Sequence, residues 1–152
     1  GGAEELAFEV TGDVEKSGWR RNCGWRFVCK NSITITKVML YGGITSTVTI
    51  WDDEGNLLAK VEGVSGKDGG WGDAVALSSP LRLEAGKAYR IAVYTDYKAG
   101  QSFWYIRPGG YTASDDIEIT NGCYGDWGKE EGYPHILQKW AIFGLVNFKY
   151  TK

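Results

Sequence analysis

Short segments in which apolar and polar residues alternate, separated by glycine-rich turns, constrain the fold of this chain more than any other feature. In the segment 47–51, Val48 and Ile50 share one face of an extended chain, which is the period of a half-buried strand. The 22 glycines are about twice the average usage of ~7%, and runs that favour helices are almost absent. On these grounds, strands are expected at Glu5–Val10, Arg26–Cys29, Ile33–Tyr41, Thr47–Trp51, Leu57–Val64, Trp71–Leu77, Leu81–Leu83, Ala88–Thr95, Phe103–Arg107, Ile117–Cys123 and Ala141–Tyr150.

Regular spacing of these strands, without a strand–helix–strand rhythm or a repeat of fixed period, indicates the fold class. We expect an all-β fold, a two-sheet antiparallel β-sandwich that is jelly-roll-like and has about ten strands. Between Ile35 and Val38 the apolar phase slips, which indicates a β-bulge. With 152 residues, a single domain spanning 1–152 is expected, in which residues 1–22 form an N-terminal extension or an edge strand.

Charge and hydropathy disfavour two classes of partner. The 17 basic and 19 acidic residues are interspersed and give a net charge of −2, so no basic face is expected to bind duplex nucleic acid. No run of about 18 apolar residues is present, so no membrane insertion is expected.

The three cysteines allow one disulfide at most. Cys23 and Cys29 would be too far apart on one straight strand to bridge, so a disulfide would join Cys123 to one of them. Cys23 is the preferred partner because it and Cys123 both lie in loop-like stretches, whereas Cys29 lies in an apolar run typical of a buried free thiol. The alternative is three reduced cysteines in a cytoplasmic protein.

Signs of catalysis are missing from the sequence. His135, the single histidine, follows Pro134 in a loop without a surrounding motif, and nucleophile, zinc and phosphate-binding motifs are absent. The adjacent acids that could hydrolyse glycosides are Asp52/Asp53, Asp115/Asp116 and Glu130/Glu131, and such pairs in turns usually face solvent. We therefore expect no enzymatic activity and no catalytic residues.

No cofactor is expected, with one alternative. The loop Asp52–Asn56 begins like a calcium-binding loop, which leaves a structural calcium ion as that alternative. Its glycine comes too early for an EF-hand and no bidentate glutamate follows at the required distance, so an ordinary Asx turn is favoured.

The seven tryptophans and nine tyrosines are the functional lead, because exposed ring area is usually kept for a partner. Many of them fall in the loop-rich segment Asp96–Lys139. Trp51, Trp71, Tyr89 and Trp140 are expected in the core or as cover for a sheet edge, and Trp104 could face either way because Phe103 and Tyr105 compete for the interior. The expected ligand-binding residues are Tyr97, Trp104, Tyr111, Tyr124, Trp127 and Tyr133.

A second aromatic-basic patch comes earlier in the chain. It combines Trp19 and Trp25 with Arg20, Arg21 and Arg26. Such interleaving is found where proteins stack on single-stranded nucleic acid. Because the chain as a whole is slightly acidic, cation–π packing within the protein is the favoured interpretation.

From Gly24 onward, the order of turns and apolar positions resembles a known family. The order runs through Gly24–Phe27, Ile35–Tyr41, Val48–Trp51, Gly55–Ala59, Gly70–Trp71, Leu77–Leu81 and Leu83–Tyr89, and closes with Gly132–Pro134 and Gly144–Phe148. It is similar to jelly-roll-like β-sandwich modules of unassigned function found in bacterial extracellular and surface proteins and in phage virion-surface proteins. The resemblance implies an extracellular, cell-surface or virion-surface location, and no catalytic residues come with it.

Two functions from different classes fit these observations. The first is a non-catalytic extracellular binding module that recognises a glycan or cell-surface polymer through its aromatic loops. The second is a structural subunit of a virion (tail, fibre or capsid decoration) or of a self-assembling surface filament, whose rings bury against a virion partner or by self-association. In that case Gly1–Val10 would be a candidate donor strand to a neighbour.

Overall fold

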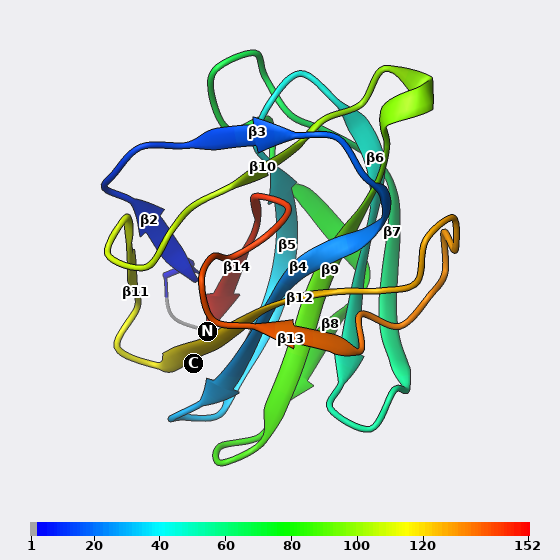
Figure 1. Ribbon diagram of the computed structural model, residues 1–152. Coiled ribbons are helices and arrows are strands. Elements are labelled where there is room, and N and C mark those ends of the chain that lie inside the picture. Colours follow the sequence, from blue (N-terminus) through cyan, green and yellow to red (C-terminus); the bar gives the residue numbers. More distant parts are fainter. Residues whose placement is uncertain (1–2) are drawn as a thin grey trace.

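Two antiparallel sheets lie face to face and form the β-sandwich that the alternation predicts (Figure 1). The computed structural model describes residues 3–152. One sheet has the order β1 (Glu5–Leu6), β14 (Val146–Thr151), β5 (Ile33–Leu40) and β8 (Val75–Leu83). The other has the order β13 (Ile136–Gln138), β12 (Ile117–Tyr124), β4 (Arg20–Cys29), β9 (Ala88–Asp96), β6 (Thr45–Asp52) and β7 (Leu57–Ser65).

Smaller elements close the ends of the sandwich. They are the pair of β3 (Glu15–Ser17) with β10 (Phe103–Tyr105), the pair of β2 (Phe8–Val10) with β11 (Tyr111–Ala113), and the 3-10 helix η1 (Tyr97–Ala99). Several of the described strands contain only two or three residues, which is too few for alternation to reveal them. Within residues 3–152, no helix has the length and apolar character needed to cross a membrane.

The core lies between the two sheets and is rich in aromatic rings. On β4, alternation turns Trp25 and Phe27 inward, where both are fully buried and their ring centroids are 5.2 Å apart. Across the interior, Phe148 of β14 lies 5.8 Å from Trp25, and the indole N–H of Trp25 donates to the carbonyl of Val146 at 2.8 Å. The bonded indole joins the two sheets without leaving a buried donor unpaired.

The bulge expected in the strand that begins at Ile33 is confirmed. Ile35 pairs with Tyr150 and Leu81, whereas Lys37 pairs with Lys149 and Ala76, so the register shifts on both sides of β5. This extra residue lets Ile33, Ile35, Val38 and Leu40 all remain buried although their spacing changes.

The N-terminal segment pairs within its own chain. β1 joins β14 through Glu5 and Tyr150, and β2 joins β11 through Phe8 and Ala113. A donor strand at Gly1–Val10 is therefore a wrong prediction over the described part of that segment, while Gly1 and Gly2 lie outside the described residues. The side chains explain the pairing, because Ala7 and Phe8 are buried in the core.

The predicted Cys23–Cys123 disulfide is also wrong, since all three cysteines are free and buried. Cys23 faces Tyr124 across the β4–β12 pair, and Cys123 faces Gly24. Cys23 and Cys123 are thus offset by one residue and project from opposite faces of the sheet, where no disulfide can form. Burial raises the pKa of the Cys23 thiol to about 12 and that of Cys29 to about 11, so both are protonated at neutral pH.

The long outer strands of both sheets are interrupted. In β7, Gly63 has a φ of 70° and lies in a bulge where the register with β6 shifts. In β8, Leu77–Pro80 bulges away from β5, and Pro80 has no N–H to donate. The other two outer strands, β1 and β13, have two and three residues. These features are the ones that prevent strands of another chain from extending a sheet.

Candidate aromatic binding surface

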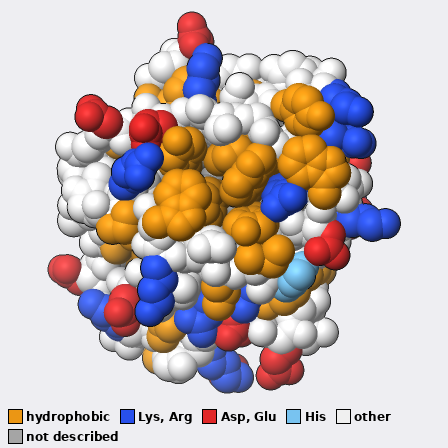
Figure 2. Space-filling view, viewed as in Figure 1, with side chains coloured by type: hydrophobic (Ala, Val, Ile, Leu, Met, Phe, Trp, Pro, Cys, Tyr) orange, Lys and Arg blue, Asp and Glu red, His pale blue; other side chains and the backbone are white. Residues whose placement is uncertain are grey.

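Rings from several parts of the chain gather at the end of the sandwich crossed by β3 and β10. In Figure 2, hydrophobic side chains cover much of this face, with basic side chains among and beside them. We call this surface the aromatic platform and define it by Trp19, Arg21, Tyr97, Tyr105, Tyr124, Trp127 and Trp140.

The most exposed pair of rings in the platform is Tyr97 with Trp127. Their side chains are 46% and 47% exposed, and the ring centroids are 5.9 Å apart with the planes tilted by 51°. Tyr97 opens η1, whose N-cap Asp96 accepts a hydrogen bond from the backbone N–H of Lys98 at 2.9 Å. Gly100 ends this turn in the left-handed conformation that glycine adopts readily. Tyr97 is therefore held on a capped turn.

Arg21 links the exposed ring of Trp127 to the body of the protein. Its Cζ lies 5.1 Å from the Trp19 ring, 4.9 Å from Tyr124 and 4.9 Å from Trp127, which is cation–π range. Trp19 and Arg21 reach the same side because they are two residues apart in extended chain. The cation–π packing expected in the early patch is thus confirmed for these two residues. Trp25 is instead buried in the core, and Arg26 bonds Asp53 on the outer face of the sheet.

Buried rings support the platform from below. Trp19 packs against Phe103 at 4.3 Å and Phe143 at 5.2 Å, and both of those phenylalanines are buried. Trp140 lies 4.9 Å from Phe143 and 5.8 Å from Tyr105, yet it remains 46% exposed. Trp140 therefore covers the edge of the core, as expected, and also presents a ring to solvent.

The loop 125–135, which carries Trp127, is fixed to the outer face of the six-stranded sheet. Asn22 of β4 is buried, and its Nδ2 donates to the carbonyls of Glu130 at 2.8 Å and Gly132 at 2.9 Å. Arg90 of β9 is also buried and donates from Nη1 to the carbonyl of Pro134 at 2.7 Å. Tyr133 lies over Arg90, with 4.8 Å between Cζ and the ring centroid. These contacts restrain the loop and with it Trp127.

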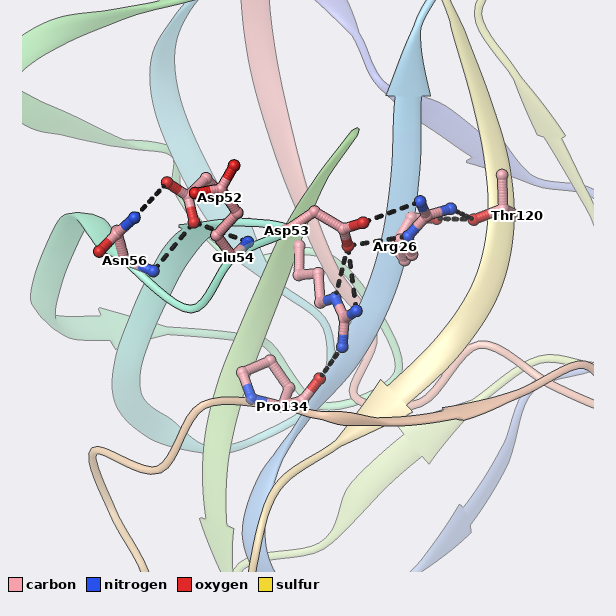
Figure 3. A network of polar contacts seen from close by, with 8 residues as sticks. Arg26, Asp52, Asp53, Glu54, Asn56, Thr120 and Pro134 are labelled. Atoms are coloured by element: carbon pink, nitrogen blue, oxygen red, sulfur yellow. Dashed lines mark hydrogen bonds and ion pairs between the residues drawn. The ribbon is translucent and has the colours of Figure 1, made fainter. Parts of the chain in front are cut away.

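A carboxylate completes this anchor (Figure 3). Asp53 accepts from Nε and Nη2 of Arg26 at 2.9 and 3.0 Å, and from Nε of Arg90 at 3.0 Å. Hydrogen bonding to Arg26, reinforced by Arg90, lowers the pKa of Asp53. The carboxylate thus neutralises two arginines, of which Arg90 is nearly inaccessible to solvent.

Asp52, next to this anchor, makes the Asx turn that we expected. Its Oδ1 accepts from the backbone N–H groups of Glu54 and Asn56, both at 2.9 Å, and its Oδ2 accepts from the Asn56 side chain (Figure 3). Protein donors therefore occupy the carboxylates of both Asp52 and Asp53. Across residues 3–152, no group of three or more His, Cys, Asp and Glu side chains is arranged to hold a metal ion.

His135 occupies an exposed place in the same loop region. Its Nε2 lies 2.7 Å from Oδ1 of Asp126, and both side chains are largely solvent-exposed. It is a surface hydrogen-bonding residue, as its loop context predicts.

Three of the six predicted ligand-binding residues do not join the platform. Trp104 alternates with Phe103 and Tyr105 and turns the other way, where it is half-buried against Tyr41 with Lys16 above its ring. Tyr111 is half-buried and packs on Phe8, with 6.1 Å between the ring centroids.

Tyr133, the third, covers the outer face of the six-stranded sheet. Its ring lies 5.5 Å from that of Trp51, and its hydroxyl is buried without a hydrogen-bond partner. Burial raises the pKa of this hydroxyl.

The other three predicted residues, Tyr97, Tyr124 and Trp127, meet around or beside Arg21. The platform residues missing from that prediction are Trp19, Arg21, Tyr105 and Trp140, of which Trp19 and Arg21 had been assigned to the separate early patch.

Three hollows in the surface are lined by other residues than those of the platform, and one of them, of about 500 Å³, lies between the N-terminal segment and β11. One of about 400 Å³ is lined by Asp13, Glu15, Arg107, Pro108 and Gly110. It adjoins the platform through Arg107, whose Cζ is 5.9 Å from the Trp140 ring. A hollow of about 420 Å³ lies at the turns that precede β7 and β9, with Leu58, Leu81 and Tyr89 among its lining residues. The exposed rings thus form an open surface rather than a deep pocket.

The described geometry combines a β-sandwich, loops held on its outer face and an aromatic surface at one end. The search of curated proteins finds no match to the chain. A family described as a domain of unknown function, DUF4082, matches residues 9–140, a range that contains β3 to β13 and every residue of the platform. The chain belongs to this DUF4082 family.

Proposed function

We propose that this domain is a non-catalytic, extracellular binding module that recognises a glycan or cell-surface polymer through the aromatic platform. Sugar rings present apolar C–H faces, and tryptophan and tyrosine offer large, rigid ring faces at little conformational cost. The observation that carries the proposal is that Tyr97 and Trp127 are almost half exposed while the structure beneath them is fixed. A contiguous patch of exposed rings on a soluble domain often marks an interaction site.

Fixed support matters because binding then requires little ordering of the protein. Tyr97 is held by the capped turn η1, and Trp127 by its contact with Arg21 and by the anchored loop. An exposed ring that must be immobilised on binding loses part of its contact energy to side-chain entropy. A pre-arranged pair avoids most of that loss.

Retention on polysaccharides tests this function. We expect Trp127→Ala and Tyr97→Ala each to weaken retention in affinity electrophoresis by roughly tenfold, since stacking on one ring contributes on the order of 1–2 kcal/mol. Trp104→Ala is the matched control, because Trp104 lies outside the platform and its loss should leave retention unchanged. Unaltered retention of both platform variants, with folding verified by circular dichroism, would show that the rings do not bind the ligand.

A structural role in a virion or surface filament is the second candidate, and one observation favours it. Leu137 is 39% exposed on the short outer strand β13, close in sequence to Trp140, and aliphatic surface suits protein contacts better than sugar contacts. The molar mass in solution separates the candidates. We expect a monomer by size-exclusion chromatography with light scattering, and a stable oligomer dissociated by Leu137→Asp would favour assembly.

A further inference from the structure

Arg21 lies in the middle of the aromatic platform without an acidic partner. None of the ion pairs among residues 3–152 includes it. Its Nε is buried and has no hydrogen-bond partner. The rings of Trp19, Tyr124 and Trp127 surround its guanidinium, and a ring face attracts a cation but offers no lone pair to an N–H donor.

Four of the five other arginines have an acidic partner, and the exception, Arg82, donates to the hydroxyl of Thr34. Arg20 lies 3.4 Å from Asp96, Arg107 lies 2.9 Å from Glu15, and Asp53 bonds two more arginines. Arginine has five in-plane donors that match the two oxygens of a carboxylate or sulfate. Because Nε is buried, an anionic group from outside the protein would bind Arg21 at its terminal Nη groups, which make no hydrogen bond within the described chain.

Lysines close in sequence to the exposed rings add positive charge to the segments that carry these rings. Lys98 follows Tyr97, Lys129 is two residues from Trp127, and Lys139 precedes Trp140. All three lysines are exposed, and none takes part in an ion pair of the described chain.

Acidic residues near Trp127 offset this excess only in part. Asp126 is hydrogen-bonded to His135, and Glu130 is exposed. The segments that carry the rings therefore hold more unpaired cations than anions, although the whole chain carries a net charge of −2. An anionic polymer would be attracted to this end of the molecule.

We propose that the aromatic platform selects an anionic glycan, whose sugars carry carboxylate or sulfate groups, and that Arg21 binds the anionic group while Tyr97 and Trp127 stack on the sugar rings. This inference rests on the proposed function, because it names the ligand class of the same surface. A neutral glycan offers Arg21 only hydroxyl and ring oxygens, which bind a guanidinium more weakly than the two charged oxygens of a carboxylate or sulfate.

Matched pairs of polymers test the inference directly. Affinity electrophoresis would compare polygalacturonate with its carboxyl-reduced form, and dextran sulfate with dextran, so that only the anionic group differs within each pair. We expect the affinity of the wild-type domain for at least one anionic polymer to be at least about ten times its affinity for the neutral counterpart. Preferential retention by polygalacturonate would identify the carboxylate as the recognised group, and preferential retention by dextran sulfate would identify the sulfate.

Variants of Arg21 separate specific recognition from general charge. Arg21→Met should lose most of this preference, and Arg21→Lys should lose part of it because lysine keeps the charge but not the forked donors. Arg82→Met is the matched control, since Arg82 is exposed on β8 of the four-stranded sheet, does not belong to the platform, and takes part in none of the ion pairs of residues 3–152. Urea midpoints would verify that each variant is folded, and Arg21→Lys carries the test if Arg21→Met unfolds.

The outcomes distinguish this inference from the proposed function. Equal retention on both members of each pair, with Trp127→Ala still weakening it, would overturn anionic selection and leave the glycan-binding function standing. An anionic preference that Arg82→Met reduces as much as Arg21→Met would overturn the role of Arg21. Absence of retention on every polymer, on these pairs and on a broad glycan array, would overturn both.

Discussion

Replacing Asp53 by asparagine should destabilise the domain, because one carboxylate neutralises two arginines. The amide keeps the shape of the side chain but turns an NH2 group toward guanidinium donors that need an acceptor. Arg90 would then keep only the carbonyl of Pro134, while its side chain is 8% exposed. Arg26 is less affected because it also donates to Thr120.

The magnitude follows from burial. Breaking a buried ion pair by removing one partner costs about 3–5 kcal/mol, whereas a solvent-exposed pair contributes ~0–1 kcal/mol. Asp53 is 35% exposed and Arg90 is nearly inaccessible, so the pair lies between these cases. We expect Asp53→Asn to lower the free energy of unfolding by about 2–3 kcal/mol, which is roughly 4–12 °C in Tm for a domain of this size.

Urea unfolding followed by tryptophan fluorescence would measure the change at neutral pH. Asp115→Asn is the control, since Asp115 is exposed and takes part in no ion pair of the described residues. The pKa of Asp53 is lowered in the folded state, so its contribution is present above the unfolded value of about 3.9 and is lost as the pH falls further. Asp53→Asn should therefore flatten the stability curve below about pH 4. A change no larger than that of Asp115→Asn would refute this account.

Three further predictions concern other parts of the sandwich. Without reductant, a thiol reagent should detect no thiols in the native protein and three after unfolding in guanidinium, because Cys23 and the other two cysteines are buried and free; a single thiol would reveal a disulfide. Tyr150→Phe should cost about 1–3 kcal/mol by urea titration, because the Tyr150 hydroxyl donates to buried Asp116. Since burial raises the Tyr150 pKa, wild-type stability should also fall as the pH rises above about 10, and this part of the fall should be absent in the variant. Asn22→Ala should speed amide exchange in the loop 125–135 and not in β5, and equal exchange in that loop would show that Asn22 does not hold it.

The strands of the sandwich were predictable because each segment carries its own evidence. Alternation in 47–51 and the phase slip after Ile35 depend on neighbouring residues, and the structure confirms a strand at the first and a bulge at the second. The strand is not half-buried as its alternation indicates, because Thr49 and Trp51 on its outer face are buried as well. The disulfide prediction failed because it needed the register between β4 and β12, which one sequence does not reveal. A shift of one residue there places Cys23 and Cys123 on opposite faces.

The ring surface was only partly predictable for the same reason. Tyr97, Tyr124 and Trp127 come together through contacts that span most of the chain, centred on or beside Arg21 of β4. Tyr133 is as aromatic and as close to glycine as Trp127, but the buried guanidinium of Arg90 draws it onto the sheet. Trp19 and Arg21 are two residues apart, so an extended chain places them on one side. This spacing indicates part of the platform, but the sequence does not show that the loops carrying Tyr97 and Trp127 lie next to these two residues.

The interrupted outer strands have a consequence for a protein held at high local concentration. Backbone groups at the rim of a sheet can template pairing with a neighbour, and crowded copies then grow into aggregates. Gly63 and Pro80 interrupt β7 and β8, the two outer strands that are long enough to serve as templates. Many copies of this domain can therefore stand side by side, or in tandem, and remain separate folded units.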